Sequence, residues 1–328
     1  QPLLGNESCN LGSINLSKFY IEDDGNWQSK IDWDRLKKVT NSSTHFLDNV
    51  IDANKYATQD IEEMTKATRK IGLGVMGFAD LLIQLRIPYN TELAREVGES
   101  LMKFIRDNSD LYSKHLANLR GVYPAGEGND EYRNACRMTV APTGTISMIA
   151  GCSSGIEPSF ALVWKKSNIL EGKTLYYSNK YFEEDAKEYG FYSEDLMEYL
   201  SNGGSLQDRD EVPQWIKEVY ITSPEISPEA HVLMQAAFQK SVDSGISKTI
   251  NFPNEATRED VQEAYLLAWE TDCKGITVYR AGSREKEVLV KGTDKKEEPS
   301  ICCDSPNIVE ESGCETCKSC GWSLCHVA

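Results

Sequence analysis

The chain has 328 residues, of which 35 are Lys or Arg and 51 are Asp or Glu, so its formal net charge is −16. Hydrophobic residues make up 40% of the chain, which is enough for a packed core and excludes a disordered protein. No apolar run approaches the roughly 20 residues that a membrane-spanning helix needs. The acidic balance, with no basic stripe, excludes a typical nucleic-acid-binding protein. A small anionic ligand would need a local pocket of backbone N–H groups.

The first segment begins Gln1-Pro2 without an initiator Met, and we expect either a processed chain or a fragment. Cys9 follows within residues 7–16, where short polar residues surround a thiol before an apolar, strand-like run. A lone Cys is more often a small buried hydrophobic residue than a reactive group. These residues alone therefore assign no role to Cys9.

Gly72, Gly74 and Gly77 have the spacing of the dinucleotide-binding fingerprint G-x-G-x-x-G. However, charged, helix-like sequence at residues 60–64 precedes them instead of an apolar strand, and no acidic ribose ligand follows at the expected distance. We therefore interpret residues 71–77 as a tightly packed, Gly-lined helix rather than as a nucleotide-cofactor site.

The middle of the chain combines a long helix with a loop of small residues. Apolar residues recur at helical spacing over residues 92–120, with Thr91 as a possible cap and Gly121 as the end. The loop that follows is rich in hydroxyl groups and consists of Ala141, Pro142, Thr143, Gly144, Thr145, Ile146 and Ser147. A helix that starts here would offer its unpaired N–H groups to an anion such as phosphate, although Pro-Thr-Gly also forms ordinary turns. Residues 151–158 continue the run of small residues.

The sequence of the last part of the body predicts a parallel strand pair. We expect a helix over residues 228–243, a strand over 248–252, a helix that opens with a capping box of Thr257 and Asp260, and a strand over 276–279. A strand, a helix and a second strand within about 30 residues form a βαβ crossover. The expected class is therefore α/β.

The composition changes after residue 282. Residues 283–300 are rich in charged residues and predict a flexible linker between a body over residues 1–282 and a tail over residues 301–328. The tail holds six of the ten cysteines, namely Cys302, Cys303, Cys314, Cys317, Cys320 and Cys325. Overlapping CxxC units at this density indicate tetrahedral zinc or an exchangeable dithiol in a reducing compartment, rather than a secreted disulfide scaffold.

Several stretches together resemble the catalytic subunit of ribonucleotide reductases, and specifically the adenosylcobalamin-dependent (class II) branch. The similar stretches are residues 1–4, 7–15, 69–80, 141–158, 234–240, 247–253 and 275–280 and the Cys-rich tail. The resemblance implies the second half of a ten-stranded α/β barrel built from two five-stranded halves. In this family a segment Asn-Pro-Cys-Gly-Glu precedes Gln-Pro-Leu-Leu and carries the radical Cys and the general base, so the resemblance implies an inactive C-terminal part of the enzyme.

The resemblance also implies roles for individual residues. Cys9 matches one member of the redox pair that reduces the ribonucleotide, and residues 141–147 match the loop that binds the substrate phosphates. Residues 151–158 are expected near the substrate and the cobalamin. The resemblance implies a cytoplasmic enzyme that forms a homodimer when complete.

For the tail, the resemblance implies a dithiol that carries electrons from thioredoxin or glutaredoxin to the buried disulfide. Cys320 and Cys325 are our candidates for this dithiol, because they lie nearest the C-terminus. Cys314 and Cys317, with Cys302 or Cys303, are the candidate zinc ligands, although adjacent cysteines chelate one tetrahedral ion awkwardly. The competing assignment gives the exchange role to Cys317 and Cys320 and gives Cys325 to the metal.

Two other interpretations stay open from the sequence. A class I reductase subunit would take its radical from a separate metal-containing partner, and a non-catalytic interaction protein with a zinc-ribbon tail would explain the cysteines without an active site. The sequence does not distinguish diphosphate from triphosphate substrates, because the phosphate loop does not count phosphates.

Overall fold

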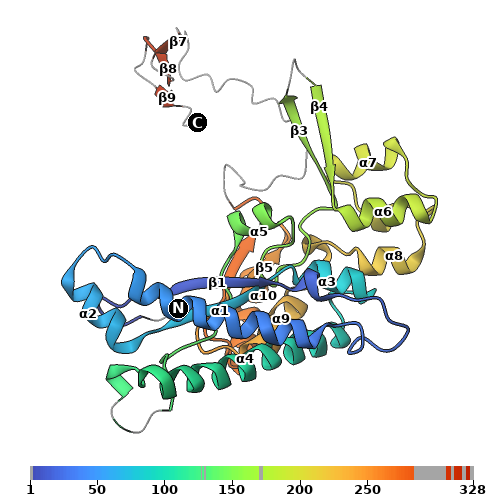
Figure 1. Cartoon of the computed structure of the whole chain (residues 1–328). Coiled ribbons are helices and arrows are strands. Elements are labelled where there is room, and N and C mark those ends of the chain that lie inside the picture. The colour runs from blue at the N-terminus through green and yellow to red at the C-terminus, as the bar shows by residue number, and fades with distance from the viewer. Residues whose placement is uncertain are drawn as a thin grey trace. The chain divides into compact units, whose positions relative to one another are not determined.

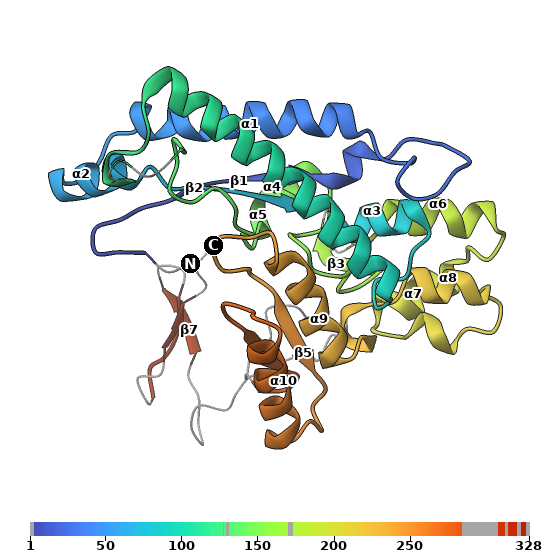
Figure 2. The same ribbon diagram turned by 90° about the horizontal axis from the view of Figure 1, so that it is seen from below.

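The structure is a computed structural model, and it describes residues 3–126, 128, 131–169, 173–283, 308–311, 314–319 and 323–325. The chain divides into two compact units, Gln1–Lys291 and Gly292–Ala328, which are described separately below. Figures 1 and 2 show the described elements in two orientations.

The centre of the first unit consists of short parallel strand segments, and their order in space is the same as their order in the chain. β1 (Asn10–Asn15) pairs with β2 (Ile71–Met76), and β5 (Thr249–Phe252) pairs with β6 (Thr277–Arg280), both in parallel. Parallel bridges from Leu73 to Met138 and from Val140 to Ile246 join the two pairs through residues 136–140. The predicted βαβ unit is confirmed, and the carboxyl ends of all these segments meet at one edge. Closure into a barrel is not seen among the described residues.

A helical layer covers one face of β1 and β2. α1 (Trp33–Ala53) packs directly on both strands, and α4 (Glu92–Arg120) packs on α1. α2 (Gln59–Thr68) precedes β2 in the chain, and α3 (Phe78–Leu85) follows it. Figure 1 shows α1 and α4 below β1, with α5 (Gly144–Ala150) above it. Leu73, Val75, Met138 and Val140 belong to the apolar core that includes residues of α1 and α4. The helical side of the strands is therefore the packed side.

The helix ends follow the local signals in the sequence. Thr91 caps α4 by accepting a hydrogen bond from Ala94 N, and Gly121 follows its last residue. α10 (Arg258–Glu270) begins with the predicted capping box of Thr257 and Asp260. α9 (Pro228–Gln239) starts where predicted but ends four residues before residue 243. Short 3-10 turns complete this set at Leu16–Phe19, Pro124–Gly126, Leu206–Asp208 and Ser223–Glu225.

Between residues 140 and 246 the chain leaves the central strands, and its residues 162–220 build a second apolar core. This region contains a hairpin of β3 (Val163–Ile169) and β4 (Lys173–Ser178), followed by α6 (Lys180–Glu188), α7 (Glu194–Ser201) and α8 (Gln214–Val219). Phe182, Leu196 and Tyr220 lie at its centre. A salt bridge from Arg86, just after α3, to Asp185 on α6 ties this region to the main body.

The interpretation of residues 71–77 as a Gly-lined helix is wrong. Residues 71–76 form β2, and Gly77, with φ 73°, leads into α3. The charged helix before them ends at Thr68, and Arg69 adopts the left-handed conformation that separates helix from strand. Gly74 is required by packing, because a Cβ there would lie 2.2 Å from the carbonyl oxygen of Thr139 on the neighbouring segment.

The second unit contains a small antiparallel sheet. β7 (Ile308–Glu311), β8 (Cys314–Cys317) and β9 (Ser323–Cys325) pair in that order. Across the part of the chain that the structure describes, no helix combines the length and apolar character needed to cross a membrane.

Candidate functional site

The predicted phosphate loop lies at the carboxyl edge of the central strands. It follows Val140, and its second half forms the first turn of α5, so the predicted helix start is confirmed. Thr143 takes the cap position with φ 56°, a left-handed conformation that is uncommon for a β-branched residue. Gly144 has open space where a Cβ would point, and Thr145 is exposed. The turn therefore presents backbone N–H groups and one hydroxyl to solvent.

The other two hydroxyls of the loop are engaged within the protein. Thr143 is 7% exposed, and its Oγ1 accepts the N–H of Gly155 over 2.7 Å. Ser147 is 1% exposed, and its Oγ lies 2.8 Å from the Oγ of Ser154. The sequence suggested three hydroxyls for a ligand. In this structure the hydroxyls of Thr143 and Ser147 hold the loop in place, so only the hydroxyl of Thr145 remains to bind a ligand.

A strap of residues 153–157 supports the loop and connects it to other elements. Ser153 donates its N–H to Asp80 Oδ2 over 2.8 Å, and its carbonyl accepts the N–H of Gly77 over 2.8 Å. The carbonyl of Ile156 accepts the hydroxyl of Tyr89 over 2.6 Å. Burial raises the pKa of Asp80, although the hydrogen bond from Ser153 opposes that shift. The strap is thus held by α3 and by the turn before α4.

Cys9 lies immediately before β1 and is half-buried. A Cβ on Gly12 would contact Leu47 of α1, so neighbouring Leu11 and Ser13 point to the opposite face of the strand. Cys9 shares that face, because a Cβ on Gly72 would lie 3.2 Å from its sulfur and 2.5 Å from Leu11 Cδ2. We call this side the site face. It carries small and polar residues, with Leu11 52% exposed.

Cys9 and the loop occupy opposite ends of the same strands. Gly12 pairs with Leu73, and Leu73 pairs with Met138, so these three residues lie at the same height in the sheet. Cys9 is three residues before Gly12 and Val140 is two residues after Met138, so the two are about five residues apart along the strand direction. At about 3.3 Å per residue, this corresponds to about 17 Å along the strand direction. α5 lies on the side of β1 away from α1 and α4, which is the side of the site face (Figure 1). A ligand that touches both would lie along the site face.

A buried carboxylate lies two residues before Cys9 in the chain. Glu7 is 8% exposed, and its Oε2 accepts hydrogen bonds from Lys70 Nζ over 2.7 Å and from Leu4 N over 2.9 Å. Burial raises the pKa of Glu7, but these hydrogen bonds outweigh it, so that the pKa lies below its ordinary value. Glu7 therefore stays ionised at neutral pH.

Three other cysteines of the body are poorly suited to thiolate chemistry. Burial raises the pKa of Cys136, Cys152 and Cys273, and Cys152 reaches about 11 with help from the nearby Asp80 charge. A thiolate is the reactive form of cysteine, so these side chains are expected to remain inert thiols. They provide natural controls for Cys9.

In the tail, the strand register places two predicted residues side by side. Cys314 of β8 is paired with Cys325 of β9, whereas Cys317 is paired with Ile308 and is buried. Cys302, Cys303 and Cys320 lie outside the described residues. Among the residues that are described, no group of three or more His, Cys, Asp or Glu side chains is placed to hold a metal ion.

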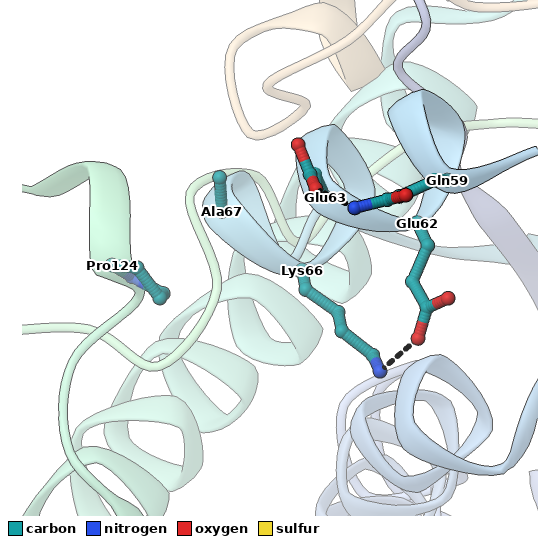
Figure 3. A pocket seen from close by; sticks show the side chains of 6 residues that line it. All are labelled: Gln59, Glu62, Glu63, Lys66, Ala67 and Pro124. Atoms are coloured by element: carbon teal, nitrogen blue, oxygen red, sulfur yellow. Dashed lines mark hydrogen bonds and ion pairs between the residues drawn. The ribbon is translucent and has the colours of Figure 1, made fainter.

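A surface hollow on α2 contains none of these candidate residues. Figure 3 shows its lining, which comprises Gln59, Glu62, Glu63, Lys66, Ala67 and Pro124. Lys66 is paired with Glu62, so the excess charge of the hollow is negative. It is therefore a poor receptor for the phosphates expected at the loop.

Sequence reasoning missed several residues around the loop. Asp80 and Tyr89 gave no signal, because each contacts a strap about 70 residues away in the chain. Lys248 was placed in a strand without a role, yet it is 1% exposed. Gly72 was noted only for its spacing from Gly74 and Gly77. That spacing was the one sequence feature indicating that the site face has no room for a side chain at this position.

Comparison with known proteins identifies the class to which this fold and site belong. The family model for the ribonucleotide reductase barrel domain matches residues 2–131 and 129–279. The chain therefore belongs to the ribonucleotide reductase barrel-domain family. A solved structure, the Actinobacillus ureae class Id ribonucleotide reductase alpha subunit, is similar with a TM-score of 0.70 and 26% identity, over 84% of this chain and 50% of that chain.

Particular relatives narrow the resemblance to one branch. The vitamin B12-dependent ribonucleoside-diphosphate reductase of Thermoplasma acidophilum is 51% identical over 91% of this chain and 39% of its own length. The enzyme of the same description from Mycobacterium tuberculosis (strain CDC 1551 / Oshkosh) is 42% identical over 90% of this chain and 42% of its own length. The ribonucleoside-diphosphate reductase subunit alpha of Chlamydia pneumoniae is 29% identical over 94% of this chain and 34% of its own length.

The predicted resemblance to the B12-dependent branch is thus confirmed. The chain spans about two fifths of the length of the B12-dependent relatives.

Proposed function

We propose that this chain forms the thiol-bearing and phosphate-binding part of an adenosylcobalamin-dependent enzyme that reduces ribonucleotides to 2′-deoxyribonucleotides. The observation that carries the proposal is the 51% identity to a vitamin B12-dependent ribonucleoside-diphosphate reductase, which extends over 91% of this chain. Identity to the subunit alpha relative is only 29%, which favours the B12-dependent branch over the class I alternative. The family match over the whole body disfavours a non-catalytic interaction protein.

In this proposal the first turn of α5 binds the substrate phosphates. The loop contains no Lys or Arg, so its orphan backbone N–H groups and the exposed Thr145 hydroxyl supply the hydrogen bonds. The substrate is a ribonucleoside diphosphate or triphosphate, and its ribose reaches along the site face towards Cys9. Gly72 and Gly74 keep that face free of side chains that would block the sugar.

Cys9 supplies electrons in the proposed reaction. Replacing the ribose 2′-hydroxyl by hydrogen requires two electrons and two protons, and the oxygen leaves as water. Cys9 and a second thiol provide both while their sulfurs join in a disulfide. When bound, adenosylcobalamin supplies the radical that starts the reaction. Ile146 and Ile149, three residues apart on α5, are exposed apolar side chains on one helix face that would contact its corrin ring.

The tail is proposed to restore the Cys9 thiol. Cys320 and Cys325 would exchange with the disulfide and then be reduced by thioredoxin or glutaredoxin, while Cys314, Cys317 and either Cys302 or Cys303 would hold zinc. A three-stranded antiparallel sheet with a CxxC unit is compatible with a zinc ribbon.

One observation favours the competing tail assignment. The backbone register pairs Cys325 with Cys314 across β9 and β8, and in the competing assignment these two cysteines are both zinc ligands. Cys317 and Cys320 would then form the exchanging CxxC dithiol.

The remaining proposals are a body over residues 1–282, a linker over 283–300, a cytoplasmic location and a homodimeric complete enzyme.

The test of this function is co-expression with the preceding part of the Thermoplasma acidophilum relative, followed by an assay of deoxyribonucleotide formation with adenosylcobalamin. We expect turnover in the complex and none when Cys9→Ser replaces the native chain, whether the reductant is thioredoxin or dithiothreitol. The matched control, Cys273→Ser, should retain activity. An active Cys9→Ser complex would contradict the proposed role of this thiol.

A further inference from the structure

A buried ammonium group, that of Lys248, contacts the end of the strap that supports the phosphate loop. The proposed reaction does not use it. The side chain of Lys248 has no exposed surface, and its Nζ lies 2.6 Å from Glu157 Oε2, 2.7 Å from His231 Nδ1 and 2.6 Å from the carbonyl oxygen of Thr249. An ammonium group has three donors, and each of them meets one of these acceptors. The three partners come from the strap, α9 and β5.

This arrangement fixes the state of the histidine. Nδ1 of His231 can accept from Lys248 only when the ring is neutral, and Nε2 then donates to the carbonyl oxygen of Ser223 over 3.2 Å. Burial and the Lys248 charge lower the pKa of His231 to about 3. Glu157 is therefore the one anionic partner of the buried ammonium group among the described residues.

Glu157 holds the end of the strap on β5 through both carboxylate oxygens. Its Oε2 accepts from Lys248, and its Oε1 accepts the backbone N–H of Thr249 over 2.6 Å. Two residues earlier, Gly155 donates its N–H to Thr143. A short covalent segment therefore connects the ion pair with the cap of the phosphate loop.

Thr143 needs this support because its backbone is strained. A left-handed conformation at a non-glycine residue costs about 1–3 kcal/mol and persists only where the surroundings enforce it. The strap provides that enforcement, since Gly155 bonds the Thr143 side chain. A Cβ on Gly155 would lie 3.2 Å from the carbonyl oxygen of Ala141, which shows how closely the strap follows the loop.

We propose that Lys248 and Glu157 are positioning residues that set the geometry of the phosphate loop through the strap. This inference rests on the proposed function for its effect on substrate. Neither residue touches the phosphates. The ion pair anchors residue 157, the strap holds Thr143 in its strained conformation, and Thr143 orients the first N–H groups of α5.

The test compares two Lys–Glu pairs in the same chain. Glu157→Gln removes the charge beside Lys248, and Glu99→Gln removes the charge from the exposed pair of Glu99 and Lys240, whose Nζ and Oε2 are 2.7 Å apart. Hydrogen exchange is measured at the amides of residues 147–155, which include the first hydrogen-bonded amide of α5, with α1 and α4 as internal references. Because the lost contact is a charged hydrogen bond, we expect at least about tenfold faster exchange in Glu157→Gln at these amides, with unchanged α1 and α4. Glu99→Gln should match the native chain.

A substrate arm separates this inference from the proposed function. In the co-expressed enzyme, Glu157→Gln should raise KM for cytidine diphosphate by about tenfold and leave kcat within about twofold, as expected for weakened phosphate binding. Unchanged exchange at residues 147–155 in Glu157→Gln would overturn the inference, whatever the native chain does with nucleotides. No turnover by the native complex would count against the proposed function and leave the exchange result valid.

A second variant, Thr143→Val, tests the inference independently if the Glu157→Gln chain does not fold. Thr143→Val keeps the β-branched shape and removes the hydroxyl that accepts from Gly155, so it cuts the same connection at its other end. We expect faster exchange at the hydrogen-bonded amides of residues 147–152 here too. Native exchange rates in Thr143→Val would show that the strap does not hold the loop.

Discussion

A Cβ at position 72 would lie 3.2 Å from the sulfur of Cys9, so the thiol occupies the space that the missing side chain of Gly72 leaves. Cys9 lies immediately before β1, Gly72 lies in the adjacent parallel strand β2, and both are on the face opposite α1. This relationship gives the thiol its place on the site face.

The first prediction concerns this contact. Gly72→Ala places a methyl group against Cys9 and Leu11, and we expect it to cost about 1–3 kcal/mol of unfolding free energy and to alter the alkylation rate of Cys9. Gly74→Ala should cost more, because its Cβ would meet the backbone carbonyl of Thr139. Gly275→Ala is the control, since its Cβ has open space. Urea unfolding and iodoacetamide labelling provide the measurements, and a Gly72→Ala chain with native stability and labelling would contradict the described packing.

The second prediction is a pH dependence of stability that arises from His231. The pKa of His231 is about 3 in the folded protein, whereas the ordinary value of 6.5 applies in the unfolded chain. As the pH falls, the unfolded chain therefore takes up a proton at this residue before the folded chain does. Stability from this group is therefore complete above about pH 6.5 and is lost as the pH falls towards 3. Between about pH 7.5 and pH 5 the loss should be about 2 kcal/mol. Urea unfolding at the two pH values measures it.

His231→Gln should remove this part of the pH dependence, because glutamine can accept from Lys248 and does not titrate. The exposed His115 supplies the matched control, and His115→Gln should behave as the native chain does. If His231→Gln shows the same loss of stability as the native chain between the two pH values, His231 is not the neutral buried group described above.

The third prediction concerns a second buried charge cluster. Asp48 has no exposed side-chain surface, and it binds Arg69 over 2.8 Å and Arg120 over 3.2 Å. Asp48→Asn leaves these cations short of a carboxylate and should lower the unfolding free energy by about 3–5 kcal/mol. Asp107→Asn, which breaks the exposed pair with Lys103, should cost less than about 1 kcal/mol. Equal effects in urea unfolding would contradict the burial of Asp48.

The fourth prediction decides between the two tail assignments. In the co-expressed enzyme, Cys320→Ser and Cys325→Ser should each abolish turnover with thioredoxin, keep turnover with dithiothreitol and retain zinc, if these two cysteines form the exchanging dithiol. Zinc analysis and the two reductants give the readouts. Loss of zinc in Cys325→Ser would instead support the pairing of Cys325 with Cys314 in the metal site.

The sequence predicted those features that depend on neighbouring residues. The ends of α4 and the capping box of α10 follow from side chains within one turn of each helix end. By contrast, residues 71–76 form a strand that pairs with β1. Glycine disfavours a helix interior, and the alternation of Ile71, Leu73 and Val75 has the period of a strand, so the helix interpretation overlooked a local signal. For the helix start at Gly144, the residues alone left an ordinary Pro-Thr-Gly turn as the alternative.

The supports of the site could not be predicted in the same way. Glu157, His231 and Lys248 are spread over about 90 residues of sequence, and only the fold brings them into contact. A buried lysine in a strand looks like an exposed one until the elements that cover it are known. The engaged hydroxyls of Thr143 and Ser147 are a similar case, because the strap that binds them has no sequence signature.

The most direct measurement is hydrogen exchange at the amides of residues 141–150, with and without cytidine diphosphate and with inorganic diphosphate alone. If the first turn of α5 binds substrate phosphates, exchange at Gly144, Thr145 and Ile146 should slow several-fold with either ligand, and the amides of α2 should not change. Unaltered exchange at these three amides at millimolar cytidine diphosphate, in a chain whose folded state is verified, would contradict the assignment of this loop.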